Sequence, residues 1–350
     1  MAHTVRGPVP VENLGITLCH EHLLIDMTQF LAEVHEASRK ALTEAPVGIE
    51  ILGELRRDPM ICRDNLFQGD VELAIREASH FKRAGGRTVV DCTPVGLGRD
   101  VRALRIISEA TDLNIIAGTG WYTEAFQTGA HKKYVSEKND EELASVMIRE
   151  IEQGVADTGI RCGIIGEIGT AWPVTPIEQK IVRAAVYAQK KTRAPISMHV
   201  DAWARNAHAI LDILEREGAD FEKVVLDHVD EGSLVYDGGF DLEYALSLAK
   251  RGCYIGFDTF GVELYLDAWG TRDPIDAERV AGIRQLVERG YCARILLSHD
   301  VGLKTNLKTF GGYGFDHLLT HITPMFRRAG LAEEHINQMF VENPKRFLGF

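Results

Sequence analysis

No stretch of this sequence approaches the roughly 18 uninterrupted apolar residues that a membrane-spanning helix requires. The first residues, MAHTVRGPVPVENLG, lack the apolar core of a secretory signal. Long runs of like charge and Pro/Ser-rich linkers are also missing, and the six cysteines show no CxxC spacing. We therefore expect a cytoplasmic protein with no membrane partner, with reduced thiols, and with residues 1–350 forming one domain.

An excess of basic residues is missing too. The chain carries 39 Lys and Arg against 51 Asp and Glu, which gives a formal net charge of −12 at pH 7. An acidic chain gains no counterion release on the phosphate backbone of a nucleic acid, so nucleic acid is not an expected partner. The length of 350 residues and the hydrophobic content of 45% allow a large buried core, as in an enzyme that acts on a small molecule.

Short apolar segments rich in β-branched residues alternate with helical patterns along the chain. Strands with both faces buried in a parallel sheet have this composition. The expected strands are 16–26, 88–94, 114–120, 162–170, 195–200, 224–230, 253–259 and 294–300. The expected helices are 71–84, 101–112, 140–156, 176–191, 205–217, 241–251, 276–289 and 316–329. Eight alternations predict an α/β fold of the (β/α)8 or TIM-barrel class.

Residues 27–69 interrupt this alternation after the first strand. A connection between a strand and the next helix usually has a few residues, and this one is far longer. Two runs within it, FLAEVHEASRKAL and IEILGELRR, look locally helical. The segment is therefore predicted to be an inserted cap or lid that packs over the mouth of the barrel, or that meets another subunit in a homodimer.

Side chains that can bind a metal come at or near the ends of five expected strands. In chain order they are His20, His22, Glu167, His199, His228 and Asp300. The strands of a parallel barrel open their C-terminal ends on one face, so these side chains are expected to meet there. Imidazole nitrogens and carboxylate oxygens bind divalent ions, and a carboxylate such as Glu167 can bridge two of them. The set therefore predicts a metal site.

A single buried histidine is more often a hydrogen-bonded core residue than a metal ligand, so this prediction depends on the whole set. His299, beside Asp300, should point to the opposite face of its strand and be packed and hydrogen-bonded. Asp91 and Asp258, on the second and seventh expected strands, are candidate partners of the metal ligands or equally well buried structural acids.

Five motifs spread over nearly the whole chain carry a family resemblance. They are TLCHEHLL at 17–24, GIIGEIGT at 163–170, SHD at 298–300, KTNLKTFGGYGFDHLL at 304–319 and ENPKRFL at 342–348. The combination resembles the amidohydrolase superfamily and, within it, the phosphotriesterase and phosphotriesterase-related proteins.

The resemblance implies a barrel that binds two divalent ions per chain, bridged by a carboxylate and a hydroxide. One ion would be held by His20, His22 and Asp300, and the other by His199 and His228. Zinc is the favoured metal, with manganese, iron, cobalt and nickel as alternatives.

Two positions differ from the phosphotriesterases. Those enzymes bridge their metals with a carboxylated lysine on strand 4, whereas Glu167 stands at this position, as in the phosphotriesterase-related branch. On strand 7 they have a proton-relaying histidine after the aspartate, whereas this sequence reads Asp258-Thr259. Efficient hydrolysis of organophosphate esters is therefore not expected.

Two cations that share a water lower its pKa towards neutrality and supply a hydroxide nucleophile. We expect it to attack the carbonyl of a small, anionic amide, ester or lactone, such as an N-acyl amino acid, an N-acyltaurine or a lactone. Asp300 would act as the catalytic acid and base. Loop residues expected near the barrel mouth are candidate substrate contacts: Trp121, Tyr122, Trp172, Arg205 and Lys304.

Three other functions remain open on the sequence alone. A phosphotriesterase would act on organophosphate esters, and a paraoxon assay would detect it. A mononuclear deaminase of the same superfamily needs no bridge on strand 4, so Glu167 counts against it, and a metal content near one ion per chain would favour it. A non-catalytic ligand-binding barrel would have no reason to keep a complete set of metal-binding side chains.

Overall fold

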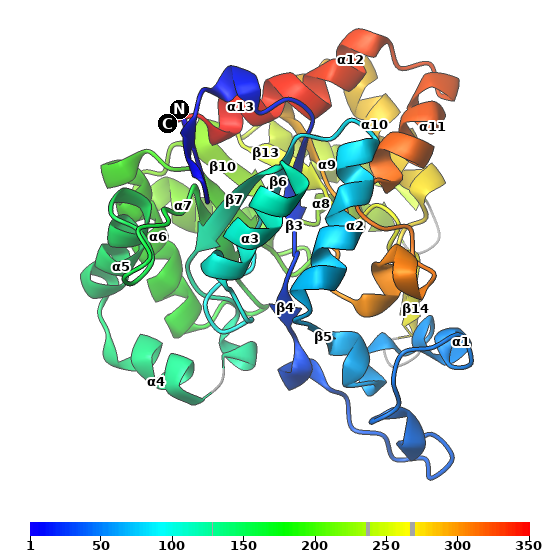
Figure 1. The fold of residues 1–350 in the computed structure, drawn as a ribbon. Coiled ribbons are helices and arrows are strands. Elements are labelled where there is room, and N and C mark those ends of the chain that lie inside the picture. The colour runs from blue at the N-terminus through cyan, green and yellow to red at the C-terminus, as the bar shows by residue number, and fades with distance from the viewer. Residues whose placement is uncertain (128, 236–238, 267–269) are drawn as a thin grey trace.

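Eight parallel strands surrounded by helices form the centre of the molecule (Figure 1). The structure is a computed structural model that describes residues 1–127, 129–235, 239–266 and 270–350. In their order around the sheet the strands are β16 (Ile295–Leu297), β13 (Tyr254–Phe257), β10 (Val224–Leu226), β9 (Ile196–His199), β8 (Ile164–Gly169), β7 (Asn114–Thr119), β6 (Thr88–Asp91) and β3 (Thr17–Glu21). Next to the ends of β16 and β3, the Asp300 N–H donates to the His20 carbonyl oxygen at 3.3 Å. The sheet is thus nearly closed, which confirms the predicted (β/α)8 barrel.

Helices follow the strands where the sequence predicts them. They are α2 (Val71–Arg83), α3 (Val101–Thr111), α5 (Asp140–Glu152), α6 (Pro176–Thr192), α7 (Ala207–Glu217), α9 (Leu242–Ala249), α10 (Asp276–Glu288) and α11 (Thr323–Arg328). Two of them begin at capping boxes, where Asn139 and Thr175 each accept a hydrogen bond from the N–H of the glutamate three residues on. The further helices are α1 (Leu52–Leu55), α4 (Gly129–Glu137), α8 (Val229–Gly232), α12 (Glu333–Asn337) and α13 (Asn343–Leu348).

Small antiparallel ribbons lie outside the barrel. They pair β1 (Ala2–Thr4) with β2 (Gly7–Val9), β4 (Ile25–Asp26) with β5 (Phe67–Gln68), β11 (Leu234–Val235) with β12 (Gly239–Phe240), and β14 (Tyr265–Leu266) with β15 (Thr271–Arg272). The two termini lie side by side, and the Phe350 N–H donates to the Met1 carbonyl oxygen at 2.9 Å (Figure 1). Within the described ranges, no helix combines the length and the apolar composition needed to cross a membrane.

A buried network joins the first and last strands of the barrel. Glu21 Oε1 accepts hydrogen bonds from Ser298 Oγ at 2.8 Å and from the His299 N–H at 2.9 Å, and Glu21 Oε2 accepts from the Val301 N–H at 3.2 Å. The His299 ring bonds to Glu21 through Nδ1 at 2.6 Å and accepts the Leu318 N–H through Nε2 at 3.0 Å. His299 is therefore packed and hydrogen-bonded, as predicted, and the network fixes the strands that carry the candidate ligands.

The inserted segment 27–69 lies at the end of the barrel opposite the termini, and its last residues form β5, which pairs with β4 (Figure 1). It has a small core of its own, formed by Val47, Leu55, Ile61 and Cys62. The prediction of helices over FLAEVHEASRKAL and IEILGELRR is largely wrong, because these runs form only short 3-10 turns and the single turn of α1. Helices this short are marginal by themselves, and packing around the small core decides their conformation.

Candidate metal centre

The predicted metal-binding side chains meet at the C-terminal end of the barrel strands. His20 lies within β3 and His22 follows it directly, Glu167 lies within β8, and His199 is the last residue of β9. Gly166, before Glu167, has a φ of 145°, and an added Cβ would lie 2.7 Å from the Ser197 carbonyl oxygen. Glycine at this position therefore allows the close approach of β8 and β9 that places Glu167 between its neighbours.

His228 and Asp300 reach the site through an unusual backbone conformation. They lie two and three residues beyond β10 and β16, and their φ angles are 59° and 52°. A left-handed backbone at a residue other than glycine costs about 1–3 kcal/mol, so the surrounding contacts must hold it. One such contact is the hydrogen bond from the His228 N–H to Asp258 Oδ1, at 2.8 Å.

Donor atoms of His20 and His22 lie close to Asp300 and Glu167. His22 Nε2 lies 3.1 Å from Asp300 Oδ1 and 3.3 Å from Glu167 Oε1. His20 Nε2 lies 3.6 Å from Asp300 Oδ1 and 3.8 Å from Glu167 Oε2. The ligand atoms of His20, His22 and Glu167 all lie within 4.8 Å of one another. One ion, at about 2 Å from each donor, could span this spacing.

A second group of donors lies on the other side of Glu167. His199 Nδ1 lies 3.3 Å from Glu167 Oε2 and 3.0 Å from His228 Nε2. The ligand atoms of these three residues also lie within 4.8 Å of one another. Glu167 therefore belongs to both groups, with Oε1 towards His22 and Oε2 towards His199, which is the arrangement of a carboxylate that can bridge two positions.

Two atoms at the centre of the site have no hydrogen-bond partner. They are His20 Nε2 and Glu167 Oε2, and both residues are buried, at 2% and 3% exposed. A buried polar atom without a partner is costly, and a buried carboxylate needs a compensating positive charge. A divalent cation would satisfy both atoms, so the donor set fits a metal.

A threonine fixes the orientation and the tautomer of His22. The Thr93 hydroxyl donates its proton to the Leu24 carbonyl oxygen at 3.0 Å, so it accepts a hydrogen bond from His22 Nδ1 at 2.9 Å. In the neutral ring the lone pair of His22 is then on Nε2, which faces Asp300 and Glu167. This is the protonation state in which an imidazole binds a metal.

A single carboxylate contacts a histidine of each group. Asp258 Oδ1 lies 3.2 Å from His228 Nδ1, and Asp258 Oδ2 lies 3.4 Å from His20 Nδ1. Asp227 Oδ1 also lies 3.4 Å from His20 Nδ1. The sequence singles out Asp258 as a candidate partner but not Asp227, because strand alternation would point Asp227 away from its neighbour His228.

The charges of the site favour a cation. Burial lowers the pKa of His22, but the nearby carboxylates of Asp300 and Glu167 raise it to about 9. Burial raises the pKa of Glu167, but the close approach of the His199 and His22 rings, each 3.3 Å from a Glu167 oxygen, holds it well below its ordinary value. The site therefore keeps its carboxylates ionised and surrounds them with histidines.

A cavity of about 910 Å³ adjoins the metal-binding side chains. Its walls are mostly apolar and come from the inserted segment and from loops after the barrel strands. This is the size and character of a pocket for a small organic molecule.

Of the predicted substrate contacts, Tyr122 lines this cavity. Its hydroxyl lies 3.1 Å from His199 Nε2, and burial followed by the Glu167 charge raises the pKa of the phenol well above its ordinary value, so it stays a proton donor. Trp121 is buried at 2% exposed and does not line the cavity. Trp172 is 56% exposed and does not line it either.

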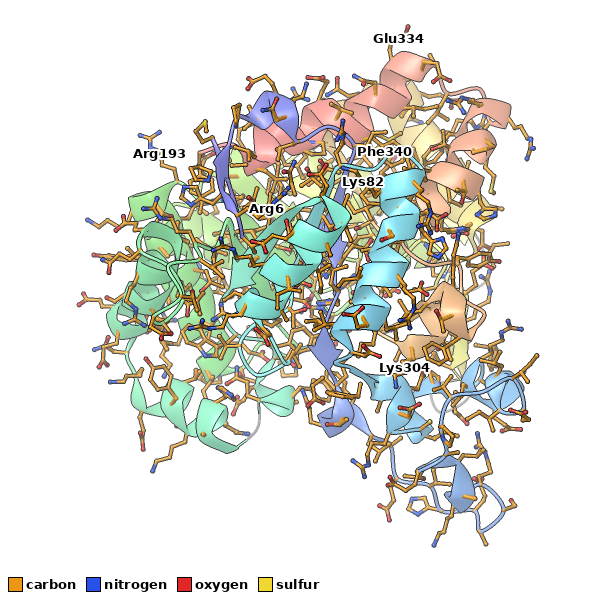
Figure 2. The ribbon with its side chains drawn as sticks, viewed as in Figure 1. Arg6, Lys82, Arg193, Lys304, Glu334 and Phe340 are labelled. Carbon is orange, nitrogen blue, oxygen red and sulfur yellow. The ribbon has the colours of Figure 1, made fainter. Side chains whose placement is uncertain are left out.

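The two predicted cationic contacts also lie away from the cavity lining. Arg205 Nη2 lies 2.6 Å from Asp241 Oδ2, and its guanidinium lies 3.9 Å over the ring of Tyr244. Lys304, labelled in Figure 2, lies beside the inserted segment, with Nζ 2.5 Å from Asp64 Oδ1. This geometry does not favour an anionic substrate group bound by Arg205 or Lys304.

A (β/α)8 barrel with histidines and carboxylates gathered at its C-terminal mouth defines a class of metal-dependent hydrolases. Residues 1–348 match the model of the phosphotriesterase family. The chain belongs to the phosphotriesterase family.

Named relatives and solved structures agree with this assignment. The N-acetyltaurine hydrolase of Tetraodon nigroviridis is 35% identical over 350 residues, which cover 99% of this chain and 97% of that protein. The crystal structure of a resiniferatoxin-binding protein from Rhodobacter sphaeroides matches with a TM-score of 0.94 and 37% identity, over 99% of this chain and 94% of that chain. A mutant of a PTE-like lactonase from Deinococcus radiodurans matches with a TM-score of 0.78 and 30% identity, over 100% of both chains. The chain is therefore a metal-dependent hydrolase.

Proposed function

We propose that this protein hydrolyses a carboxylic amide, ester or lactone with the help of two divalent metal ions. Water would add to the carbonyl carbon, and the C–N or C–O bond would break to give an acid and an amine or alcohol. The observation that carries the proposal is the shared carboxylate: Glu167 contacts donors of both groups, and its buried Oε2 has no hydrogen-bond partner. Relatives named as an N-acetyltaurine hydrolase and a lactonase support carbonyl chemistry.

The two ions would share Glu167. One would also be held by His20, His22 and Asp300, and the other by His199 and His228. When bound, they would lower the pKa of a water and polarise the substrate carbonyl. Zinc suits these nitrogen and oxygen donors, and manganese, iron, cobalt and nickel are the alternatives.

Side chains of this chain would move the protons. Asp300 would take a proton from the attacking water and deliver it to the leaving nitrogen or oxygen. The Asp300 side chain is 27% exposed, whereas that of Glu167 is 4% exposed, so Asp300 is the carboxylate that a substrate can reach. The Tyr122 hydroxyl lines the same cavity and would donate a hydrogen bond to the carbonyl oxygen.

Hydrolysis of organophosphate esters is the second candidate, favoured by the family to which the chain belongs. Thr259 stands after Asp258, and its hydroxyl donates to Asp230 Oδ2 at 2.7 Å and accepts from Arg279 Nη2 at 2.8 Å. A threonine held in this way cannot carry a proton as an imidazole does. The geometry therefore supports attack at carbon over attack at phosphorus.

A hydrolysis screen of the metal-loaded protein tests the proposal. The substrates are N-acyl amino acids, N-acetyltaurine, lactones, aryl esters and paraoxon, and the metal content is measured by mass spectrometry. We expect two ions per chain and a much higher kcat/KM for a carbonyl compound than for paraoxon. One ion per chain, or no carbonyl hydrolysis by fully loaded protein, would contradict the proposal.

A further inference from the structure

A row of aromatic rings leads from the candidate metal centre into the inserted segment. The ring of Tyr122 lies 4.7 Å from that of His199, and the rings of Phe30 and Phe126 lie 6.1 Å and 6.4 Å from that of Tyr122. Phe30 and Phe126 stack on each other, with centroids 3.6 Å apart and an interplanar angle of 11°. All four side chains line the cavity, so they form a continuous aromatic wall.

Aliphatic side chains extend this wall. Among those that line the cavity are Ile25, Met27, Ile61, Val200 and Leu303. A volume of about 910 Å³ lies near the upper end of the range for small-molecule pockets, so an acetyl group would leave most of the apolar wall uncovered. Each methylene that enters such a wall strengthens binding about fourfold.

The ionisable side chains that line the cavity are mostly acidic. Besides Glu167 and Asp300, the carboxylates that line it are Glu33, Glu36, Asp58, Asp201, Glu231 and Asp273. Asp273 is 4% exposed, and burial together with the Asp273 charge raises the pKa of Glu231 well above its ordinary value. A substrate with a carboxylate or sulfonate tail would bring one more negative charge into this wall.

The positive side chains of the wall already have partners. Among the described residues that line the cavity, the arginines are Arg39 and Arg57. Arg39 Nη2 lies 2.5 Å from Asp58 Oδ2 and 3.3 Å from Glu54 Oε2. The guanidinium of Arg57 lies 4.5 Å from the ring centroid of Tyr265. Carboxylates neutralise the charge of Arg39, so this arginine does not offset the remaining acids.

We propose that the substrate is a neutral ester, lactone or amide with a long or bulky apolar group, and that this group lies along Tyr122, Phe30 and Phe126. Its carbonyl would face the metal-binding side chains. This preference for neutral, apolar substrates rests on the proposed carbonyl hydrolysis and adds a substrate class to it. Compounds with an anionic tail, such as an N-acyltaurine, are poor substrates on this account.

The first test compares p-nitrophenyl esters from acetyl to dodecanoyl with the metal-loaded protein. The leaving group is constant, so kcat/KM reports the acyl chain. We expect kcat/KM to rise about fourfold per methylene over the first steps, until the wall is covered. A flat dependence, or a preference for the acetyl ester, would overturn the proposal.

Two variants test the aromatic wall directly. Phe30→Ala and Phe126→Ala are expected to lower kcat/KM for the dodecanoyl ester about tenfold or more and to change that for the acetyl ester little. Tyr187→Ala is the matched control, because this ring lies on α6, is 43% exposed and does not line the cavity. Equal losses for both esters would mean that the phenylalanines only stabilise the fold, and would contradict the proposed role.

A matched pair of amides tests the charge selection. N-acetyltaurine carries a sulfonate at the position where N-propylacetamide carries a methyl group. We expect N-propylacetamide, the neutral amide, to have the higher kcat/KM. The double variant Glu231→Gln/Asp273→Asn should narrow the difference. The amide that replaces the Asp273 carboxylate keeps an oxygen for the Leu264 N–H, which Asp273 Oδ2 now accepts at 3.1 Å. A preference for N-acetyltaurine in the unmodified protein would overturn the proposal.

A binding measurement separates failure of this inference from failure of the proposed hydrolysis. Methyl ketones carry a carbonyl and an alkyl chain but cannot be hydrolysed. If no ester or amide is cleaved, the proposed function fails. The aromatic wall is then tested by comparing the increase in melting temperature that 2-undecanone gives with the increase that 2-butanone gives. A larger shift with 2-undecanone, lost in Phe30→Ala, supports the apolar wall, and equal shifts contradict it.

Discussion

Asp300 has the most exposed side chain of the six candidate ligands, at 27%, and it contacts both His20 and His22. Asp300→Asn keeps an oxygen that can contact these histidines but removes the base. We expect kcat to fall by about 10²–10⁴-fold with the metal content unchanged. Kinetics and metal analysis on the same sample check this, and near-normal turnover with both ions bound would refute the acid and base role.

Asp258 offers one oxygen to a histidine of each group, so an amide at this position could serve His228 or His20 but not both as acceptor. Asp258→Asn is therefore expected to weaken metal binding by about 10–100-fold, as measured by competition with a chelator. Asp157→Asn changes a carboxylate that is 86% exposed and serves as the control. Unchanged metal affinity in Asp258→Asn would show that its contacts do not position the ligands.

Ligand types and their order were predictable from the sequence because each one follows an apolar strand-like run. The supporting residues were not, because their contacts depend on how the chain turns after each strand. Thr93 meets His22 from the loop after β6, and Asp227 points inward although it adjoins His228. Asp91, a candidate partner of the ligands, accepts the Leu23 N–H at 2.8 Å and so braces the backbone next to His22.

At the scale of elements, one buried arginine joins α10 to α8 and to the loops near β13. Arg279 donates to Asp230 Oδ2 at 2.8 Å, to Thr259 Oγ1 at 2.8 Å, and to the carbonyl oxygens of Pro274 at 2.6 Å and Val262 at 3.0 Å. The side chains of Arg279 and Asp230 are 0% exposed. Removal of one partner would leave the other as an unpaired buried charge.

Arg279→Met is expected to lower the free energy of unfolding by about 3–5 kcal/mol. Arg284→Met, on the same helix in an exposed pair with Glu288, should change it by about 0.5 kcal/mol or less. Urea denaturation measures both. If Arg279→Met does not fold, the double variant Arg279→Met/Asp230→Leu should lose less stability, because it leaves no unpaired buried charge. If Arg279→Met is as stable as Arg284→Met, the role of the buried pair is contradicted.

The barrel elements were predictable because local signals agree with the fold. Apolar runs mark the strands, and capping residues such as Asn139 and Thr175 mark where α5 and α6 begin. The inserted segment was predictable in its bounds and not in its conformation. Its apolar residues gather around Leu55 and Cys62 instead of following a helical period, and Phe310 from outside the segment packs against them. Such a contact cannot be read from a local window of sequence.

For the whole molecule, we expect metal to contribute to stability. An ion at about 100 times its dissociation constant adds about 2.7 kcal/mol to the free energy of unfolding. Protein treated with a chelator should therefore melt at a lower temperature, and added zinc should restore the melting temperature. In Glu167→Ala, the melting temperatures of chelator-treated and zinc-loaded protein should differ less. Metal analysis confirms that the chelator has removed the ions. If wild-type protein then melts at the same temperature with and without metal, a metal in the core of the barrel is contradicted.

The size and charge of the cavity are properties of the whole fold and could not be predicted from the sequence. Residues as distant as Phe30 and Phe126 stack on each other there, and the carboxylates of Glu231 and Asp273 come from α8 and from the segment after β15. The expectation of an anionic substrate came from cations such as Arg205 and Lys304, whose carboxylate partners are visible only in three dimensions.

Glu167 stands between two groups of donors, and this position has a thermodynamic consequence for loading. Because the Glu167 carboxylate serves both groups, a metal ion bound at one group changes the electron density and the orientation of this carboxylate at the other group. Linkage requires the effect to be reciprocal, so each ion alters the affinity of its neighbour by the same factor. Titration of the empty protein would then give an isotherm that a pair of independent equilibria cannot fit.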